Sequence, residues 1–236
     1  MAKLFDLHIH TTKGSSDSSL TPEELVLEAE GLGLFGLCLT EHAGPWERHE
    51  FERFAARHNV VLVRAMEVET DMGHMLAFGM DQYQGGFNKA SGLRKAADLE
   101  GGFVVSAHPF RGVFSQGKAG SLLYKALPDP LPTVPEDAIG HPVFKLAHAV
   151  EVANGGTIDE ENDFAMRVAG LLGLPVTGGS DAHSAHGLGR FVTDFDDEIN
   201  NEQEFLAALH SGRYHAAVGL RFGRLRPYTL QAAAGR

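Results

Sequence analysis

The sequence contains one cysteine and no long apolar run, and each absence excludes a class of protein. Cys38 cannot form an intrachain disulfide, and its apolar neighbours Leu37 and Leu39 indicate a position in the core. The longest apolar stretch, residues 32–39, is interrupted by two glycines and is far shorter than the roughly 18 residues of a membrane span. Because the first residues also lack an apolar export signal, we expect a cytoplasmic protein.

Positive charge and several common catalytic motifs are also scarce. The chain has 20 Lys and Arg against 31 Asp and Glu, a formal net charge of −11. Such a surface repels phosphates, so we expect no membrane contact and no avid binding of long nucleic acids. There is no Gly-x-Ser-x-Gly elbow, no Walker loop and no dinucleotide fingerprint after the first strand. With one cysteine, a cysteine-rich zinc site is excluded as well.

Apolar runs of strand length alternate with helical patterns along the 236 residues. This alternation is typical of an α/β protein with a parallel sheet. Thr21, followed by Pro22 and Glu24, predicts a helix start with a capping box. We expect strands at 3–10, 35–40, 60–69, 74–78, 103–107, 149–153, 174–177 and 191–195, and further helices at 89–100, 158–172 and 202–209.

The chain is expected to form one domain over residues 1–218. Within it, residues 111–142 are rich in Gly and Pro and show weak periodicity, which indicates a lid or an insertion. Residues 219–236 carry four arginines and no acidic residue. This basic carboxyl-terminal tail could contact a polyanion, although a solvated tail is the simpler interpretation.

Thirteen histidines are the unusual feature of this acidic chain. Alternation along a strand places Asp6, His8 and His10 on one face, which brings two imidazoles together. Further candidate ligands follow the other predicted strands or the loop after the first one: Asp17, His42, Glu67, His108, Asp181 and His183. The carboxyl ends of parallel strands meet at one rim, where crowded carboxylates repel one another unless cations neutralise them. The sequence therefore predicts a metal site.

In combination, these motifs resemble those of the PHP (polymerase and histidinol phosphatase) superfamily. The similarity extends from about residue 3 to residue 193 and depends on six ordered segments: Asp6-Leu7-His8-Ile9-His10-Thr11, Ser16-Asp17-Ser18, Thr40-Glu41-His42, Glu67, Ala107-His108-Pro109 and Ser180-Asp181-Ala182-His183. The resemblance implies a distorted seven-stranded (β/α) barrel, similar to a TIM barrel, with the metal site at the carboxyl ends of the strands. It also implies two or three divalent cations and hydrolysis of phosphate esters.

The same resemblance implies three groups of ligands. His8, His10, Glu67 and Asp181 would hold one metal, Glu67 and His108 a second, and Asp17, His42 and His183 a third. Two positions depart from the family pattern. Glu41 replaces an Asp that often precedes the His of its motif, and the strand 150–154 offers Glu151 and Asn154 where some members supply another His. Mixed imidazole and carboxylate ligands favour Mn, Fe or Zn.

Divalent cations would lower the pKa of a bound water toward about 7 and so supply a nucleophile at neutral pH. The leaving group then needs a proton, for which His183 and His74 are candidates, and Asp181 is counted with them as a catalytic residue. Substrate phosphate needs cationic or imidazole partners near the rim. Arg111, Arg190 and His186 are the candidates for this role.

The sequence thus predicts a metal-dependent phosphoesterase that acts on a small phosphomonoester or a nucleotide. Three alternatives remain open. The first is a histidinol-phosphate phosphatase, and the second is an exonuclease for short oligonucleotides. The third belongs to a different class, a noncatalytic metal-binding module that interacts with a partner protein.

Overall fold

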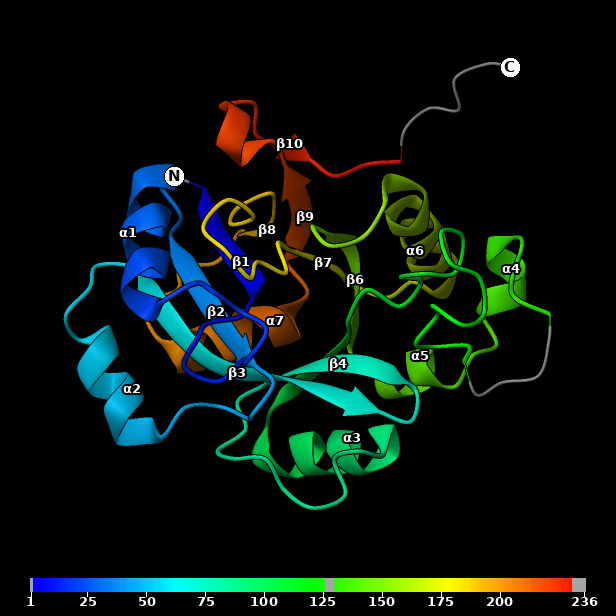
Figure 1. The fold of residues 1–236 in the computed structure, drawn as a ribbon, viewed down its shortest axis with the longest axis horizontal. Coiled ribbons are helices and arrows are strands. Elements are labelled where there is room, and N and C mark those ends of the chain that lie inside the picture. The colour runs from blue at the N-terminus through cyan, green and yellow to red at the C-terminus, as the bar shows by residue number, and fades with distance from the viewer. Residues whose placement is uncertain (1, 126–129, 231–236) are drawn as a thin grey trace.

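A computed structural model describes residues 2–125 and 130–230, in which ten strands form one curled sheet (Figure 1). The strands are β1 (Lys3–Ile9), β2 (Gly36–Glu41), β3 (Val61–Thr70), β4 (Gly73–Phe78), β5 (Phe103–Ser106), β6 (Ala149–Asn154), β7 (Val176–Gly179), β8 (Phe191–Phe195), β9 (Tyr214–Val218) and β10 (Arg226–Pro227). The helices are α1 (Pro22–Leu32), α2 (Arg48–Ala55), α3 (Ala90–Glu100), α4 (Pro135–Ala138), α5 (Val143–Leu146), α6 (Asp159–Leu172), α7 (Glu202–Ser211) and the 3-10 turn η1 (Leu220–Phe222). None of these helices is both long and apolar enough to cross a membrane.

The predicted seven-stranded, TIM-like barrel is wrong, because the sheet is mixed and has more strands. Its order is β10-β9-β8-β1-β2-β3-β4-β5-β6-β7. β1, β2 and β3 run parallel, as do β5, β6 and β7, but β4 is antiparallel to both of its neighbours. β8, β9 and β10 add an antiparallel extension next to β1. Hairpin connections therefore replace helical crossovers at two places in the chain.

The sheet curls so far that β7, one of its edge strands, lies next to β1 and β8. A single parallel bridge joins Ile9 and Ala182 at this seam. The hydroxyl of Thr193 on β8 accepts a hydrogen bond from the backbone N–H of Gly178 and donates one to its carbonyl, both at 2.9 Å. A Cβ on Gly178 would lie 2.6 Å from the carbonyl oxygen of Val192, so only glycine allows this approach. The seam is thus closed by individual hydrogen bonds and a close backbone approach instead of a full strand pairing.

A register slip in β1 decides which side chains reach the inside of the curl. The pairing of β1 with β2 shifts between Asp6 and Ile9. Phe5 and Leu7 belong to an apolar cluster inside the curl, called the inner apolar cluster below, which also contains Cys38, Phe78 and Phe205. Ile9 instead packs with residues of α1 and α2 on the outer side of the sheet. Strict alternation is therefore lost within the strand. His8 and His10 share a face as predicted, but Asp6 does not lie on it.

The inner apolar cluster fills the amino-terminal end of the curl, and α7 packs onto it. Phe205 of α7 lies 5.3 Å from Phe5, 5.5 Å from Phe78 and 5.7 Å from Phe195, measured between ring centroids. Cys38 is fully buried in the same cluster, so its predicted core position is confirmed. This end of the sheet is closed by apolar side chains, which leaves polar groups to the carboxyl ends of the parallel strands.

Capping residues define α1 as the sequence predicts. The hydroxyl of Thr21 accepts from the backbone N–H of Glu24 at 3.3 Å, and the Glu24 carboxylate accepts from the backbone N–H of Thr21 at 3.0 Å. Gly33 ends the helix with φ +71°, in the left-handed region. The predicted capping box is confirmed. α2 has no counterpart among the expected helices.

Two segments outside the predicted core elements pack against the sheet. In the expected insertion, Val113, Leu123 and Tyr124 are buried in one cluster with Phe164 of α6, while residues 126–129 lie outside the described residues. A lid role for this insertion stays a prediction.

The expected basic tail, beyond residue 218, also makes contacts. Tyr228 is buried, lies 5.6 Å from the ring of Phe191 and donates a hydrogen bond to Asp163 at 2.8 Å. Residues 231–236 of the tail lie outside the described residues. The domain boundary at residue 218 stays a prediction.

Candidate metal centre

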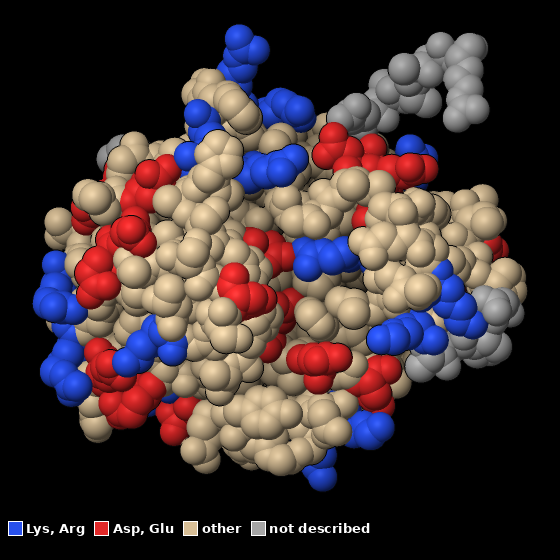
Figure 2. Space-filling view, viewed as in Figure 1, with Lys and Arg blue, Asp and Glu red and all other residues tan. Residues whose placement is uncertain are grey.

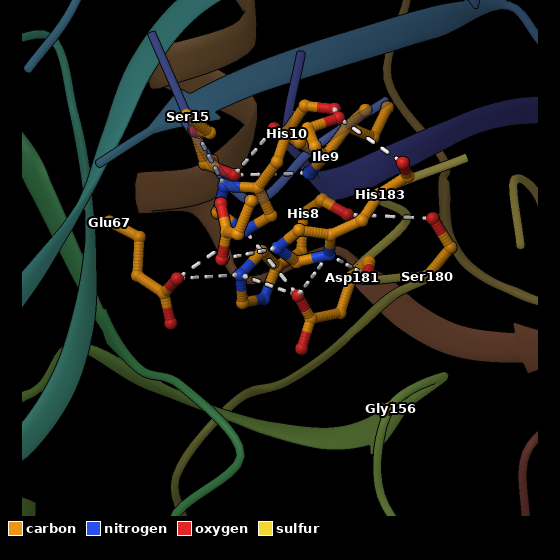
Figure 3. Close-up of polar contacts among 12 residues, drawn as sticks. His8, Ile9, His10, Ser15, Glu67, Gly156, Ser180, Asp181 and His183 are labelled. Carbon is orange, nitrogen blue, oxygen red and sulfur yellow. Dashed lines mark hydrogen bonds and ion pairs between the residues drawn. The ribbon is translucent and has the colours of Figure 1, made fainter. Parts of the chain in front are cut away.

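His8 and His10 lie at the carboxyl end of β1 with fully buried side chains, between the carboxylates of Glu67 and Asp181 (Figure 3). Nε2 of His8 is 3.4 Å from Oε2 of Glu67 and 3.6 Å from Oδ1 of Asp181. The corresponding distances from Nε2 of His10 are 3.3 and 3.4 Å. These distances are longer than usual for hydrogen bonds between nitrogen and oxygen. The four groups therefore surround a common point instead of forming two pairs.

Glu67 comes from the second half of β3, and its two oxygens face different histidines. Oε1 lies 2.9 Å from Nε2 of His108, which follows β5, and 2.8 Å from Nδ1 of His74 on β4. Oε2 faces the β1 histidines and lies 3.4 Å from Nδ1 of His42, which follows β2. Glu67 on β3 thus lies among histidines that come from four other strands, β1, β2, β4 and β5.

Asp17, His42 and His183 form a more exposed group beside His10. Oδ2 of Asp17 lies 3.4 Å from Nε2 of His42 and 3.2 Å from Nε2 of His183. The ring of His10 is stacked between the other two imidazoles, at centroid distances of 4.3 and 4.4 Å. The three outer candidates of the sequence analysis therefore adjoin the inner four. All eight predicted metal ligands lie in one cluster at the carboxyl ends of the parallel strands.

The loop after β7 carries Asp181 and is fixed by backbone contacts to β1. The backbone N–H of Asp181 donates to the carbonyl of His8 at 2.7 Å. The buried carboxylate of Asp6 accepts from the backbone N–H groups of Ser180 at 2.8 Å and Gly189 at 3.0 Å. Burial raises the pKa of Asp6 to about 6, although these hydrogen bonds oppose the shift. Asp181 itself has φ +53°, an unusual conformation that the surrounding contacts hold in place.

Glu151 on β6 orients His8 and was not among the predicted site residues. Its Oε1 lies 2.9 Å from Nδ1 of His8, and its Oε2 accepts from the backbone N–H of His108 and from Nδ2 of Asn154, both at 2.9 Å. With a cation on the Nε2 side, a carboxylate at Nδ1 favours the tautomer that carries its proton at Nδ1, which leaves the Nε2 lone pair for the cation. The available signal in the sequence was an acidic residue within an otherwise apolar strand.

Glu41 acts on His10 indirectly, through Ser15. Its carboxylate accepts from the hydroxyl of Ser15 at 2.7 Å, from the backbone N–H of Thr11 at 3.0 Å and from the indole of Trp46 at 3.1 Å. The Ser15 hydroxyl in turn lies 3.2 Å from Nδ1 of His10. The Glu that departs from the family pattern therefore lies behind the ligand cluster and supports the ring of one of its members.

The buried histidines and carboxylates shift one another's pKa values. Burial lowers the pKa of His8, but the charges of Glu151, Asp181 and Glu67 outweigh burial and raise it well above its ordinary value. Burial raises the pKa of Glu67, but His8 and hydrogen bonds from His10 and other histidines bring it well below its ordinary value. The centre therefore favours ionised carboxylates that a cation could bind.

Several ring nitrogens of the cluster need a further partner. His8 Nε2, His10 Nε2 and His108 Nδ1 are buried and have no hydrogen-bond partner among the described residues. Three groups have nitrogen or oxygen atoms within 4.8 Å of one another: His10, His42 and His183; His8, Glu67 and His108; and His8, His10 and Asp181. An unpaired buried nitrogen is costly, and a divalent cation would satisfy it. The donor set could hold divalent metal ions.

Asn154, on the strand where some members of the family supply another His, holds an arginine against the cluster. Arg111 donates through Nη2 to Oδ1 of Asn154 at 2.7 Å and also to Oδ2 of Asp181, and its Nε lies 3.3 Å from the hydroxyl of Thr157. The guanidinium therefore neutralises one oxygen of Asp181. Acidic and basic side chains adjoin near the middle of the face shown in Figure 2.

Of the remaining predicted site residues, His74 contacts Glu67, whereas Arg190 and His186 make no hydrogen bond or ion pair to the ligand cluster within the described part of the chain. His74 is half-buried, with its ring 5.2 Å from that of His108. Arg190 is exposed and donates from Nη1 to the carbonyl of Gly155, the residue after β6, at 3.2 Å. His186 is exposed on the loop between Asp181 and Arg190, and no hydrogen bond among the described residues joins it to the cluster.

Two family models match the chain. The first, described as the PHP domain, matches residues 6–120, and the second, described as PHP-associated, matches residues 159–214. An error-prone DNA polymerase of Cutibacterium acnes is 30% identical over 151 residues, which are 64% of this chain and 11% of that polymerase. The chain thus spans about a tenth of this curated relative.

Solved structures share the fold at low sequence identity. A protein of Bifidobacterium adolescentis, described as a metal-dependent phosphoesterase, superposes with a TM-score of 0.56 at 18% identity, covering 93% of this chain and 98% of that one. A lesion-specific endonuclease of Pyrococcus furiosus gives 0.59 at 17% identity, covering 92% of this chain and 58% of that one. The matched motifs and the common fold agree: this chain belongs to the PHP superfamily.

Proposed function

We propose that this protein is a metal-dependent phosphoesterase. The observation that carries the proposal is the convergence of eight imidazole and carboxylate side chains, three of whose buried ring nitrogens lack any other partner. A noncatalytic module would not need every one of these groups. The similarity to a metal-dependent phosphoesterase and to an endonuclease supports the same reaction class.

We assign the cations to three positions. His8, His10, Glu67 and Asp181 would hold one, Glu67 and His108 a second, and Asp17, His42 and His183 a third. Two or three ions of Mn, Fe or Zn would supply a water of lowered pKa and positive charge for the phosphate oxygens. The second position has the fewest protein ligands, since Asn154 binds Arg111 and Glu151.

Arginine side chains near the ligand cluster bind and orient the phosphate. Arg111 is held by Asn154, Thr157 and Asp181, so its guanidinium is fixed beside the ligand cluster. Arg190 lies at the rim, where its guanidinium donates a hydrogen bond to the carbonyl of Gly155. A planar guanidinium binds two phosphate oxygens at once, which fixes the ester relative to the cluster. His186 is assigned the outermost contact with the substrate.

Departure of the alcohol requires a proton at the ester oxygen. His74 offers its Nε2 because its Nδ1 faces Glu67, 2.8 Å away. His183 is the second candidate, with Nδ1 3.0 Å from the carbonyl oxygen of Asp181. Because Nε2 of His183 faces Asp17 in the third cation position, His183 is better assigned as a ligand, and we assign proton donation to His74. Asp181 positions the reacting phosphate through Arg111.

We infer that the substrate is a small phosphomonoester or the terminal phosphate of a nucleotide. The decisive experiment is a screen of phosphorylated metabolites, histidinol phosphate, dinucleotides and short oligonucleotides in the presence of manganese. With the substrate so found, His10→Ala and Asp181→Ala should each lower kcat by more than about 100-fold, because each removes a ligand from the shared centre.

The matched control is His210→Ala, since His210 is exposed on α7 at the opposite end of the sheet. It should keep wild-type turnover. Equal loss of turnover in all three variants would contradict the location of the site. Absence of turnover with every compound, despite bound manganese, would instead favour the noncatalytic module.

A further inference from the structure

The segment 219–227, here called the carboxyl-terminal hook, concentrates positive charge on an acidic protein. It consists of η1 and β10 and carries Arg221, Arg224 and Arg226. No Asp or Glu occurs from Gly212 to Leu230, whereas the whole chain has a net charge of −11. Figure 2 shows Lys and Arg side chains protruding at the top of the molecule, where Figure 1 places η1 and β10. This local charge attracts a polyanion that the remaining surface repels.

Arg221 fastens the hook to the loop that carries two predicted metal ligands. Its Nη1 donates to the carbonyls of Ala185 at 3.1 Å and Leu188 at 2.7 Å, and its Nη2 lies 3.0 Å from Glu28. These carbonyls belong to the loop 181–190, which contains Asp181 and His183. The hook therefore has a defined place at the rim of the centre.

The exposed arginines continue from the rim to the hook. Phe191 on β8, Val218 on β9 and Arg226 on β10 are paired in one row across the sheet. With neighbouring strands about 4.8 Å apart, Arg226 lies about 10 Å from residue 191 along this row. Arg190 precedes Phe191 and points to the carbonyl of Gly155 at the rim. Positive charge thus extends from Arg190 to the hook.

One aromatic side chain, that of Phe222, is exposed among these arginines. Phe222 is 81% exposed, and it stands next to Arg221 and two residues before Arg224. An exposed aromatic ring beside cationic side chains is the combination that single-strand binding surfaces use. A nucleobase would cover the ring by stacking, while the arginines bind the neighbouring phosphates. Bases inside a duplex are already stacked on one another, so the hook fits an unpaired strand.

We propose that the carboxyl-terminal hook binds single-stranded nucleic acid and guides its terminal phosphate to the metal centre. This inference rests on the proposed phosphoesterase activity and names its substrate class, a short single strand. Phe222 stacks on one base, and Arg224, Arg226 and Arg190 bind successive phosphates toward the rim. The strand is short because this row of arginines, from Arg190 to Arg226, extends only about 10 Å across the sheet.

The test is binding of a fluorescent oligothymidylate of about ten nucleotides, long enough for one site. Anisotropy is measured over a salt series, with a chelator present so that no hydrolysis occurs. Replacing Arg224 and Arg226 with Ala should reduce the slope of log affinity against log salt by about 1.4, since each phosphate contact on a single strand contributes about 0.7. Phe222→Ala should weaken binding about fivefold or more and leave the slope unchanged.

Arg53→Ala is the matched control, because Arg53 is exposed on α2, away from the hook. It should bind the oligonucleotide as the wild type does, and all variants should hydrolyse a mononucleotide at the wild-type rate. Equal affinity of the hook variants and the control would overturn the proposal. Loss of binding to phosphatidylserine vesicles with unchanged oligonucleotide binding would overturn it too, by assigning the hook to a lipid surface.

The two proposals fail separately in this design. Oligonucleotide binding is measured without turnover, so a protein that binds the strand through the hook but hydrolyses no phosphate ester refutes only the phosphoesterase proposal.

Discussion

Replacing Glu151 with Gln should weaken metal binding without removing any metal ligand. The carboxylate of Glu151 accepts three hydrogen bonds of 2.9 Å, from Nδ1 of His8, the backbone N–H of His108 and Nδ2 of Asn154. A glutamine has one acceptor oxygen and one NH2 group in place of two acceptor oxygens. If the oxygen keeps the bonds from His108 and Asn154, the NH2 faces His8. Nδ1 must then accept, and the proton moves to Nε2, the atom that would bind the cation.

The opposite orientation of the amide is no better. Its oxygen would then serve His8, while its NH2 group would face two donors, the His108 N–H and the Asn154 amide, in a fully buried place. Loss of such an orienting partner typically lowers metal affinity about 10- to 100-fold, or about 1.4 to 2.7 kcal/mol. We expect Glu151→Gln to fall in this range.

Isothermal titration of the metal-free protein with manganese or zinc, in competition with a chelator, measures the change. Glu30→Gln, on the exposed face of α1, removes one negative charge at a distant site and is the control. Urea unfolding of both metal-free variants separates a loss of affinity from a loss of stability. Wild-type affinity in Glu151→Gln, or an equal loss in Glu30→Gln, would refute the argument that Glu151 orients His8.

Three further predictions address the seam, the effect of pH and the rim. Gly178→Ala should lower the free energy of unfolding by about 1–3 kcal/mol, because its Cβ would lie 2.6 Å from the carbonyl oxygen of Val192; an unchanged urea midpoint would contradict the close approach. Burial, with help from a nearby arginine, lowers the pKa of His148 from 6.5 to about 4, and its Nδ1 accepts from the Val104 N–H at 3.0 Å. As the pH falls, the unfolded chain takes up a proton at His148 before the folded chain does. The contribution of neutral His148 to the free energy of unfolding is therefore fully present above pH 6.5 and is lost as the pH falls toward about 4. His148→Asn keeps an acceptor without titrating and should flatten this decline in urea unfolding, whereas identical pH profiles would exclude His148 as its source. Arg190→Lys should raise KM several-fold with little change in kcat, since an ammonium lacks the planar fork, and unchanged kinetics would remove Arg190 from the substrate site.

The positions of the candidate ligands follow from the sequence because they depend on strand ends. His8, Glu67, His108 and Asp181 lie on or directly after parallel strands, and such strands place their carboxyl ends at one rim whatever their number. An error in the strand count therefore did not disturb the cluster. The pairing of Asn154 with Arg111 could not be predicted, since the two residues are 43 positions apart and no motif links them.

The sheet topology depends on signals that are weaker than a ligand motif. β9 is five residues long and lies between the last expected helix and the expected tail, where no strand is predicted, so its antiparallel pairing with β8 has no counterpart in the prediction. The register slip in β1 also cannot be predicted from the sequence. Ile9 is as apolar as Leu7, although the two side chains pack in different clusters. Both features come from tertiary packing, which periodicity along one strand does not encode.

The seam of the curled sheet gives metal loading a mechanical consequence. β7 and the loop after it are joined to β1 and β8 by the Ile9–Ala182 bridge, the Thr193 hydroxyl and a few backbone hydrogen bonds such as Asp181 N–H to His8 O, instead of a full strand pairing. The proposed first cation position would take His8 and His10 from the end of β1 and Asp181 from the loop after β7, so an ion there would cross-link the two sides of the seam. Removal of the ion by a chelator would let β7 separate from β1 and β8 before the whole protein unfolds. The backbone amides of β7 would then lose protection from hydrogen exchange before those of the central strands.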